Sequence, residues 1–242
     1  MADFPFRALV FDVDGTLAET EELHRRAFNE TFAEAGLGWH WDRALYKELL
    51  KTTGGKERMR AYIRDHAPDL APADEDIPAL HAAKTACYAR LVEEGALALR
   101  PGIAELIADA RLQGLKVAVA TTTNLPNVEA LTRATWGLPA DEVFDAVAAG
   151  DMVNAKKPAP DVYVLAAEIL GLPPADCLAF EDSRNGLLSA KAAGMVCIVS
   201  PVVYTEDQDF SEAELVIDCF SRVDSVEALA RALSAASSTN QE

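Results

Sequence analysis

Short apolar, β-branched runs recur along the chain, with helical patterns between them. The runs occupy residues 7–13, 116–122, 144–150, 177–182, 196–200 and 215–218. They are continuously apolar rather than alternating, which is typical of strands buried on both faces of a parallel sheet. From residue 101 onward, helical periodicity separates them, in segments 102–112, 126–135, 159–170, 184–193 and 224–235. This βαβ rhythm predicts an α/β fold built on a Rossmann-like, doubly wound parallel sheet.

The interval 18–99 breaks this rhythm, because it has helical periodicity and no convincing strand. Its helical stretches are "ETEELHRRAFNETFAEAG", "DRALYKELLKT", "KERMRAYIRDH" and "IPALHAAKTACYARLVEEG". We therefore expect an α-helical cap domain at 18–99, inserted into a core that is formed by 1–17 and 100–234. The small polar residues of 235–242 predict a flexible tail.

The excess of acidic residues bears on which kinds of molecule the protein can bind. The 242 residues include 39 acidic and 22 basic side chains, a formal charge of -17. Such a balance argues against nucleic-acid or anionic-membrane partners, whose affinity comes largely from Lys and Arg. No apolar run approaches the roughly 20 residues that cross a bilayer, and Asp3, Arg7 and Asp12 interrupt any signal-like segment. We expect a cytoplasmic protein with four unpaired cysteines; the sequence sets no oligomeric state and is compatible with a monomer.

Two carboxylates, Asp12 and Asp14, follow the first apolar run in "FDVDGT". A calcium loop of the EF-hand type needs Gly at its sixth position and Glu at its twelfth. Counted from Asp12, Gly15 is fourth and Leu23 is twelfth, so that interpretation fails. A capping turn with Gly15 at the bend remains the simple structural alternative.

The ends of the other predicted strands also carry polar groups. In a parallel α/β sheet these ends meet at one edge, where ligands bind. Each group alone has a structural explanation as a strand residue, a loop or a helix cap. Their common position predicts one site. The groups at this edge are Asp12, Asp14, Thr121, Thr122, Thr123, Lys157, Glu181 and Asp182.

Electrostatics indicates what must lie among them. Two like charges 4 Å apart repel by about 4 kcal/mol at an effective dielectric constant near 20. An all-oxygen cluster without His or Cys favours a hard cation, and few protein ligands favour Mg²⁺ over Ca²⁺. Lys157 adds a fixed positive charge, while the Thr121 hydroxyl and the Thr122 N–H can hold an oxyanion. These parts suit phosphoryl transfer.

The four motifs "FDVDGT", "VAVATTT", "KKPAPD" and "FEDSRNG", in this order, resemble those of the haloacid-dehalogenase superfamily of phosphotransferases. The helical insertion matches the cap position of the subgroup that contains β-phosphoglucomutase and small-sugar phosphatases. The stretches "AETEELHRRAFN", "TTGGKER" and "TTTNLPNVEAL" further resemble the Calvin-cycle operon phosphatases (CbbY). That family removes phosphate from xylulose 1,5-bisphosphate, an inhibitor of Rubisco.

The resemblance implies a phosphoric monoester hydrolase with a small phosphorylated sugar as its substrate. It implies that Asp12 attacks phosphorus to form an aspartyl-phosphate, and that Asp14 protonates the leaving oxygen and then activates water. It implies a Mg²⁺ site made by Asp12, the Asp14 carbonyl and Asp182, with Glu181 close by or joined to the metal through a water. Thr121, Thr122 and Lys157 would bind the transferring phosphoryl group.

The cap must supply specificity, because the core motifs are shared across substrates. Glu21 and His24 share one helix face; a merely solvated polar face is the alternative. The run Gly54-Gly55-Lys56-Glu57-Arg58 opens a helix whose free N–H groups and cations suit a distal phosphate. The remaining candidates for substrate contact are His81 and Lys84 on a later cap helix, and Thr123, Asn124 and Asn127 after the second strand.

Two rival functions remain open. A β-phosphoglucomutase-type enzyme would return the phosphoryl group to a sugar, although Thr123-Asn124-Leu125 and Lys56 depart from the run after the second strand and the cap-loop Arg that such mutases typically have. A catalytically idle relative would bind a metabolite or a protein, but such a module would not need Asp12 and Asp14 together.

Overall fold

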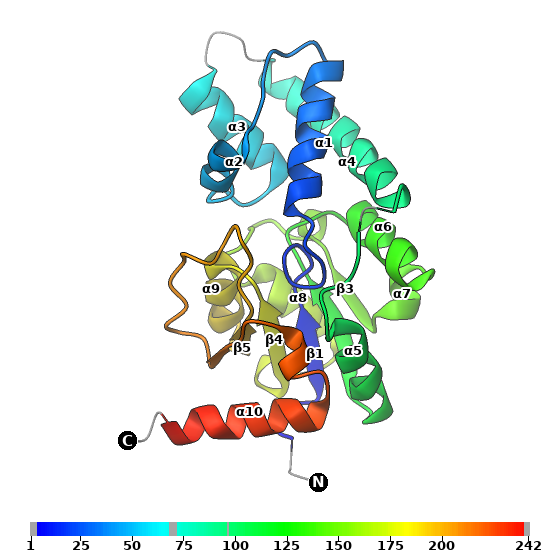
Figure 1. Ribbon diagram of the computed structural model, residues 1–242, viewed down its shortest axis with the longest axis vertical. Coiled ribbons are helices and arrows are strands. Elements are labelled where there is room, and N and C mark those ends of the chain that lie inside the picture. Colours follow the sequence, from blue (N-terminus) through cyan, green and yellow to red (C-terminus); the bar gives the residue numbers. More distant parts are fainter. Residues whose placement is uncertain (1–3, 68–71, 96, 240–242) are drawn as a thin grey trace.

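The protein has an α/β core with a helical cap above it (Figure 1). The structure is a computed structural model that describes residues 4–67, 72–95 and 97–239. The predicted core, cap and tail segments therefore include a few residues outside the described ones, namely 1–3, 68–71, 96 and 240–242. Among the described residues, no helix is long and apolar enough to cross a membrane.

The core sheet is parallel throughout, as the sequence predicts. Its strand order is β3-β2-β1-β4-β5-β6. Phe11, the last residue of β1, pairs with Val119 of β2 and Phe180 of β4, so these three strands end at nearly the same level. The strands are β1 (Ala8–Phe11), β2 (Lys116–Ala120), β3 (Ala146–Ala148), β4 (Cys177–Glu181), β5 (Val196–Val199) and β6 (Leu215–Val216).

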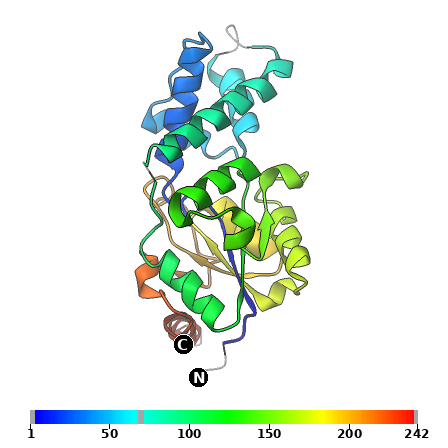
Figure 2. The same cartoon turned by 90° about the vertical axis from the view of Figure 1, so that its right-hand side faces the viewer.

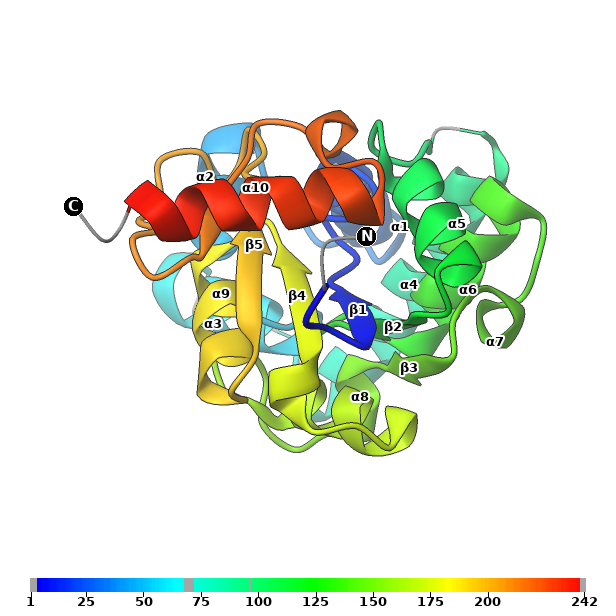
Figure 3. The same cartoon turned by 90° about the horizontal axis from the view of Figure 1, so that it is seen from below.

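Helices cover both faces of the sheet (Figure 3). Because side chains alternate along a strand, Leu9 and Phe11 of β1 join one apolar cluster, while Ala8 and Val10 join the other. The first cluster packs against α5 (Ile103–Leu112), α6 (Leu125–Trp136), α7 (Ala140–Val143) and α10 (Val226–Thr239). The second packs against α8 (Asp161–Leu170) and α9 (Arg184–Ala192).

Among its described residues the cap consists of helices joined by loops and has no strand, in agreement with the helical cap of the predicted fold class. Its helices are α1 (Glu21–Glu34), α2 (Arg43–Leu49), α3 (Gly55–His66) and α4 (Ile77–Glu93), which stand above the core (Figure 2). An aromatic cluster holds them together: Trp41 is fully buried and packs against Phe28, Phe32 and Tyr62. The cap therefore has a hydrophobic core of its own.

Helix α10 is longer than the sequence predicts. It continues to Thr239, into the segment 235–242 that its small polar residues assign to a flexible tail. Alanine and serine are compatible with a helix. Because this end has no large apolar side chains, the sequence shows no helical periodicity there.

The two linkers between cap and core run side by side. Ala18 forms bridges with both Asp14 and Leu99, and the Arg100 N–H donates to the Leu17 carbonyl at 2.8 Å. Gly102 follows with φ of +94°, and a Cβ there would lie 2.4 Å from the backbone of Phe220. This glycine lets the second linker approach the core closely enough to begin α5.

We predict that Gly102→Ala destabilises the protein by about 3 kcal/mol or more, because it combines a left-handed backbone with a backbone clash. Gly137→Ala is the matched control: its φ is +72° and nothing lies near its Cβ position. We expect only the conformational cost of about 1–2 kcal/mol there. Urea unfolding measures both. Equal losses would mean that the close approach at Gly102 is unimportant.

Candidate active site

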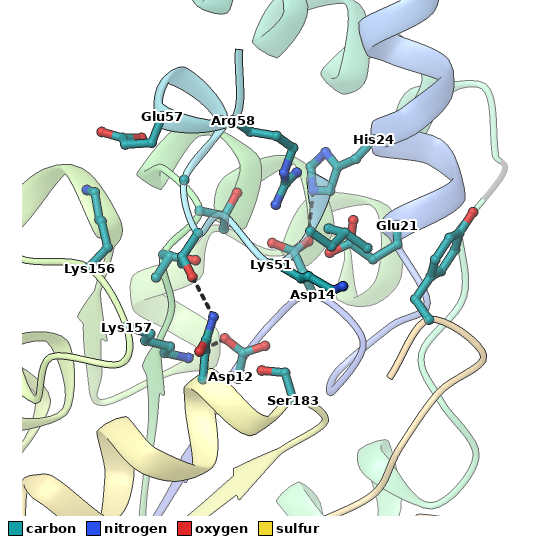
Figure 4. A pocket seen from close by; sticks show the side chains of 18 of the residues that line it. Asp12, Asp14, Glu21, His24, Lys51, Glu57, Arg58, Lys156, Lys157 and Ser183 are labelled. Carbon is teal, nitrogen blue, oxygen red and sulfur yellow. Dashed lines mark hydrogen bonds and ion pairs between the residues drawn. The ribbon is translucent and has the colours of Figure 1, made fainter. Parts of the chain in front are cut away.

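A pocket of about 510 Å³ lies between the carboxyl edge of the sheet and the cap. Figure 4 shows Asp12 and Lys157 on its core side, and Glu21, His24 and Arg58 from the cap on the other. Nearly all of the predicted site residues line it. Those that do are Asp12, Asp14, Glu21, His24, Gly54, Gly55, Lys56, Glu57, Arg58, His81, Lys84, Thr122, Thr123, Asn124, Asn127, Lys157 and Asp182.

The core side of the pocket is organised around one buried ammonium group. Lys157 Nζ donates to Asp12 Oδ1 and Glu181 Oε1, each at 2.6 Å. The Tyr163 hydroxyl donates to the same Glu181 oxygen at 2.7 Å. Asp12 follows β1, Glu181 ends β4 and Tyr163 belongs to α8, so neighbouring strands and their covering helix bring these groups together.

Glu181 supports this site from behind and does not line the pocket. It is wholly buried, and its Oε2 accepts from the Asp182 N–H at 3.2 Å and the Ser183 hydroxyl at 3.3 Å. Both of its oxygens are thus engaged, and it orients Lys157. Gly186 makes this possible, because a Cβ there would overlap the Glu181 carboxylate at 1.9 Å.

The electrostatics of this cluster show an excess of negative charge. Burial, opposed by Lys157, raises the pKa of Asp12 to about 8. Burial and the neighbouring Glu181 and Asp12 raise the pKa of Asp182 well above its usual range. Burial would lower the pKa of Lys157, but Asp12 and Glu181 outweigh it and raise that pKa. One ammonium group therefore does not neutralise the three carboxylates.

The carboxylates at this edge of the sheet could hold a metal ion. Oxygen atoms of Asp12, Glu181 and Asp182 all lie within 4.8 Å of one another. Glu181 is occupied by its hydrogen bonds, whereas the carboxylate of Asp182 has no hydrogen-bond partner within the described chain and is buried. The backbone of Gly15 lies close to the Asp182 carboxylate, because a Cβ on Gly15 would lie only 2.3 Å from Asp182 Oδ2. An all-oxygen set with surplus negative charge suits a hard divalent cation.

Asp14 is held by the cap. It accepts a hydrogen bond from the Thr20 hydroxyl, and its Oδ1 lies 2.9 Å from His24 Nε2. Lys84 Nζ lies 2.7 Å from the other ring nitrogen of His24. His24 also stacks on Tyr88, with ring centroids 4.0 Å apart. Asp14, in the turn after β1, thus contacts Thr20 and His24, which both lie on the cap side of the linker.

These contacts and the burial of the side chains shift the pKa values of Asp14, Lys84 and His24. Burial alone would raise the pKa of Asp14, but His24 and Thr20 lower it to about 2. Burial lowers the pKa of Lys84 to about 7, with Asp14 acting in the opposite direction. Burial and Lys84 lower the pKa of His24. The buried lysine and histidine thus give up protons more readily than they would in water.

The cap loop opens a helix, as the sequence predicts. Gly54 caps α3, and Lys56 and Arg58 reach the pocket from its first turn. A Cβ on Gly55 would lie 2.3 Å from His81 Nε2, so the loop passes close to α4. The buried Nε of Arg58 has no hydrogen-bond partner within the described chain, although Arg58 lines the pocket.

Sequence reasoning missed Tyr46 and Tyr163. The Tyr46 hydroxyl donates to Glu21 Oε2 at 2.7 Å and accepts from Arg58 at 3.2 Å, so it links two pocket residues. Both tyrosines lie within apolar helical patterns, where an aromatic residue normally signals core packing. Only the contacts between elements show that their hydroxyls serve the site.

Thr121 is predicted to bind phosphate but does not line the pocket. It is 1% exposed, and its hydroxyl accepts from the Thr123 N–H at 3.1 Å. It shapes the turn that presents Thr122 and Thr123. Asn124 reaches across to the cap and donates to the Thr85 hydroxyl at 3.1 Å, while Asn127 donates to the Thr123 hydroxyl at 2.9 Å.

The pocket has a different charge balance from the chain as a whole. Seven basic side chains line it, against six acidic ones, whereas the full sequence has 22 and 39. The basic residues are Lys51, Lys56, Arg58, Lys84, Lys156, Lys157 and Arg184, and the acidic ones are Asp12, Asp14, Glu21, Glu57, Asp151 and Asp182. An anionic ligand therefore meets a far less negative surface here than elsewhere.

Comparison with known proteins decides the family. The family model of haloacid dehalogenase-like hydrolases matches residues 6–194. The chain belongs to this family. It is 57% identical over 216 residues to protein CbbY of Cereibacter sphaeroides, covering 89% of this chain and 93% of that protein. The predicted enzyme class, a phosphoric monoester hydrolase, is thereby confirmed.

Solved structures agree with the fold. CbbY from Rhodobacter sphaeroides, crystallised with phosphate, matches with a TM-score of 0.89 at 55% identity, covering 93% of this chain and 99% of that chain. A variant of the same protein in complex with xylulose 1,5-bisphosphate matches equally well, with a TM-score of 0.89. The family predicted from the four motifs and the fold predicted from the alternation of strands and helices are both confirmed.

We predict that Lys84→Met stabilises the folded protein in a pH-dependent way. A lysine with a pKa of about 7 when folded, and about 10.4 when unfolded, opposes folding most strongly below pH 7. This penalty declines as the pH rises towards 10. We expect a gain of roughly 5 kcal/mol at pH 6 and about 2 kcal/mol at pH 9.

Chemical denaturation of both proteins at the two pH values measures this gain. Lys56→Met, at an exposed pocket lysine, is the control and should show no such trend. A gain for Lys84→Met that is independent of pH would contradict the charge argument.

Proposed function

We propose that this protein is a Mg²⁺-dependent phosphatase that converts xylulose 1,5-bisphosphate to xylulose 5-phosphate and so removes an inhibitor of Rubisco. The observation that carries this proposal is a pocket with cations at both ends, Lys157 in the core and Arg58 in the cap (Figure 4). Lys56, from the same turn of α3 as Arg58, also lines the pocket. A sugar bisphosphate has an anionic group for each end. The 55% identical CbbY protein that was crystallised with xylulose 1,5-bisphosphate supports this choice of substrate.

Asp12 is the nucleophile of the proposed reaction. It lies at the carboxyl end of β1, and its Oδ1 is held by Lys157 at 2.6 Å. This contact fixes the carboxylate, so that its other oxygen can face the phosphorus and form an aspartyl-phosphate. Lys157 and the Thr122 turn then stabilise the negative charge of the transferring group.

Asp14 is the proton donor and acceptor. It lies two residues after Asp12 and is held by Thr20 and His24. Protonated Asp14 would give its proton to the leaving sugar oxygen and, as a carboxylate, would then take one from the water that hydrolyses the aspartyl-phosphate. The low pKa of about 2 in the free pocket favours the second role, so an approaching phosphate dianion must raise it for the first.

Mg²⁺ would be held by Asp12, the Asp14 carbonyl and Asp182, and when bound it supplies the positive charge that lets the phosphoryl oxygens approach these carboxylates. Asp182 supports this assignment, because it is buried, raised in pKa and without a hydrogen-bond partner in the described chain. Glu181 acts through Lys157 instead.

The cap selects the substrate. Lys56, Arg58 and the first N–H groups of α3 bind the distal phosphate. Glu21, held by Tyr46, and Asn124 offer hydrogen bonds to sugar hydroxyls, whereas both ring nitrogens of His24 are already engaged by Asp14 and Lys84. Asn124–Thr85 and Asn185–Thr53 hydrogen bonds join core and cap at the pocket rim, which keeps bulk water out during the reaction.

Inorganic phosphate release tests the proposal. We expect preferential, Mg²⁺-dependent release from xylulose 1,5-bisphosphate over ribulose 1,5-bisphosphate, fructose 1,6-bisphosphate, β-glucose 1-phosphate and phosphoglycolate. Treatment with EDTA should abolish the activity, and added Mg²⁺ should restore it. Asp12→Asn should lower kcat by about 10³-fold or more, because it removes the nucleophile.

The outcomes separate the rival functions. Conversion of β-glucose 1-phosphate to glucose 6-phosphate without phosphate release would make the protein a mutase. Substantial turnover by Asp12→Asn would exclude the aspartyl-phosphate. Lack of any turnover would favour the idle relative.

A further inference from the structure

Arg100 is a buried charged residue that the proposed reaction does not use. It ends the linker that returns from the cap, is 8% exposed and does not line the pocket. Its Nη1 donates to the Gly15 carbonyl at 2.7 Å and to the Ser200 carbonyl at 2.8 Å, and its Nη2 donates to the Ser200 hydroxyl at 2.7 Å. Burying a guanidinium group is costly, so this arrangement requires an explanation.

The partners of Arg100 connect the site's main strands. Gly15 directly follows Asp14 and rests against Asp182. Ser200 follows β5, and its N–H donates to the Glu181 carbonyl at 2.8 Å. A single side chain therefore links the turn after β1 to the end of β5 and, through Ser200, to the end of β4.

The guanidinium group is itself firmly held. It lies 4.9 Å from the centroid of the Phe220 ring, and the Arg100 N–H donates to the Leu17 carbonyl at 2.8 Å. Gly102, two residues later, packs against the Phe220 backbone. The side chain is thus anchored in the core, although it belongs to a linker that leads to the cap.

We propose that Arg100 is a positioning residue that holds the Asp14–Gly15 turn in its reactive orientation. This inference rests on the proposed acid–base role of Asp14. Gly15 has φ of +86°, and its N–H donates to the Ala18 carbonyl at 2.8 Å within the turn. Its carbonyl accepts from Arg100, which ties the turn to β5 through Ser200. The anchor matters because Asp14 also contacts the cap through His24, and cap movement would otherwise displace the turn.

The geometry requires an arginine. Its planar fork reaches three acceptors on two segments at once, whereas a lysine offers one nitrogen and cannot span them in the same way. Arg100→Lys therefore keeps the charge but loses the bridge. Ser200→Ala keeps the arginine and removes one of its three hydrogen bonds.

The test compares two leaving groups. Xylulose 1,5-bisphosphate releases a sugar alkoxide and needs a proton from Asp14, whereas p-nitrophenyl phosphate releases a stable phenolate and does not. The parameter kcat/KM reports the reaction up to aspartyl-phosphate formation. For Arg100→Lys we expect kcat/KM to fall about 30-fold for the sugar phosphate and about 3-fold or less for the aryl phosphate.

Three variants calibrate this result. Asp14→Asn should show the same selective loss, to a larger extent. Ser200→Ala should show a selective loss of a few fold. Arg111→Lys is the matched control, because Arg111 also donates to a backbone carbonyl of the core, that of Val143, but away from the site. It should leave the ratio of the two kcat/KM values unchanged.

Equal losses on both substrates for Arg100→Lys and Ser200→Ala, or no loss, would overturn the proposal and make Arg100 purely structural. A variant with a smaller folded fraction would lose kcat/KM equally on both substrates, whereas misplacement of Asp14 would lower it selectively for the sugar phosphate. Thermal unfolding of each variant measures the folded fraction. If the wild type released no phosphate from either compound, the proposed function would fail. Equal losses for Asp14→Asn would instead refute the acid role.

Discussion

The buried ammonium of Lys157 between Asp12 and Glu181 is the interaction on which the site depends. Without it, three carboxylates would face one another in a region that excludes water, at a cost of several kcal/mol per pair. With it, Asp12 is held in place by a contact of 2.6 Å, and Glu181 becomes part of the support of the site. One positive charge against three negative ones leaves an imbalance, and that imbalance favours a cation.

The parallel sheet creates this constraint. Strands β1 and β4 are neighbours and end at nearly the same level, so the polar residues at their ends must share one small space. Small residues make that space sufficient. Gly15 and Gly186 each lie where a Cβ would overlap the carboxylate of Asp182 or Glu181. The glycines of the two motifs are therefore as necessary to the site as its charged residues.

The cap adds a second buried charge network, with different consequences. Lys84, His24 and Asp14 form a chain of contacts across the linker. Because Asp14 belongs to the core turn and the other two belong to the cap, the charge state of Asp14 depends on where the cap is. Arg100 restrains the same turn from the core side. Residues of the cap and of the core thus both hold the Asp14–Gly15 turn, which is where the proposed acid–base role of Asp14 would make the reaction sensitive to cap position.

The sequence was sufficient to predict the sheet, the helical insertion and most pocket residues, because apolar period and strand-end motifs are local patterns. The roles of Glu181, Thr121, Tyr46, Tyr163 and Arg100 were beyond its reach. Glu181 and Thr121 have the right residue types beside the right strands, but hydrogen bonds turn them away from the pocket. The tyrosines look like core residues, and Arg100 looks like a surface charge in a linker.

By itself, therefore, the sequence determined the order of strands and helices along the chain, the family and the edge of the sheet where the pocket lies. The tertiary structure decided which polar groups face the pocket and which support it from behind. The reason is physical: periodicity and motif spacing act along the chain, whereas the partner of a buried polar group comes from a distant segment. The contacts of Arg100 with Ser200 and of Lys157 with Asp12 span 100 and 145 residues. No local pattern carries that information.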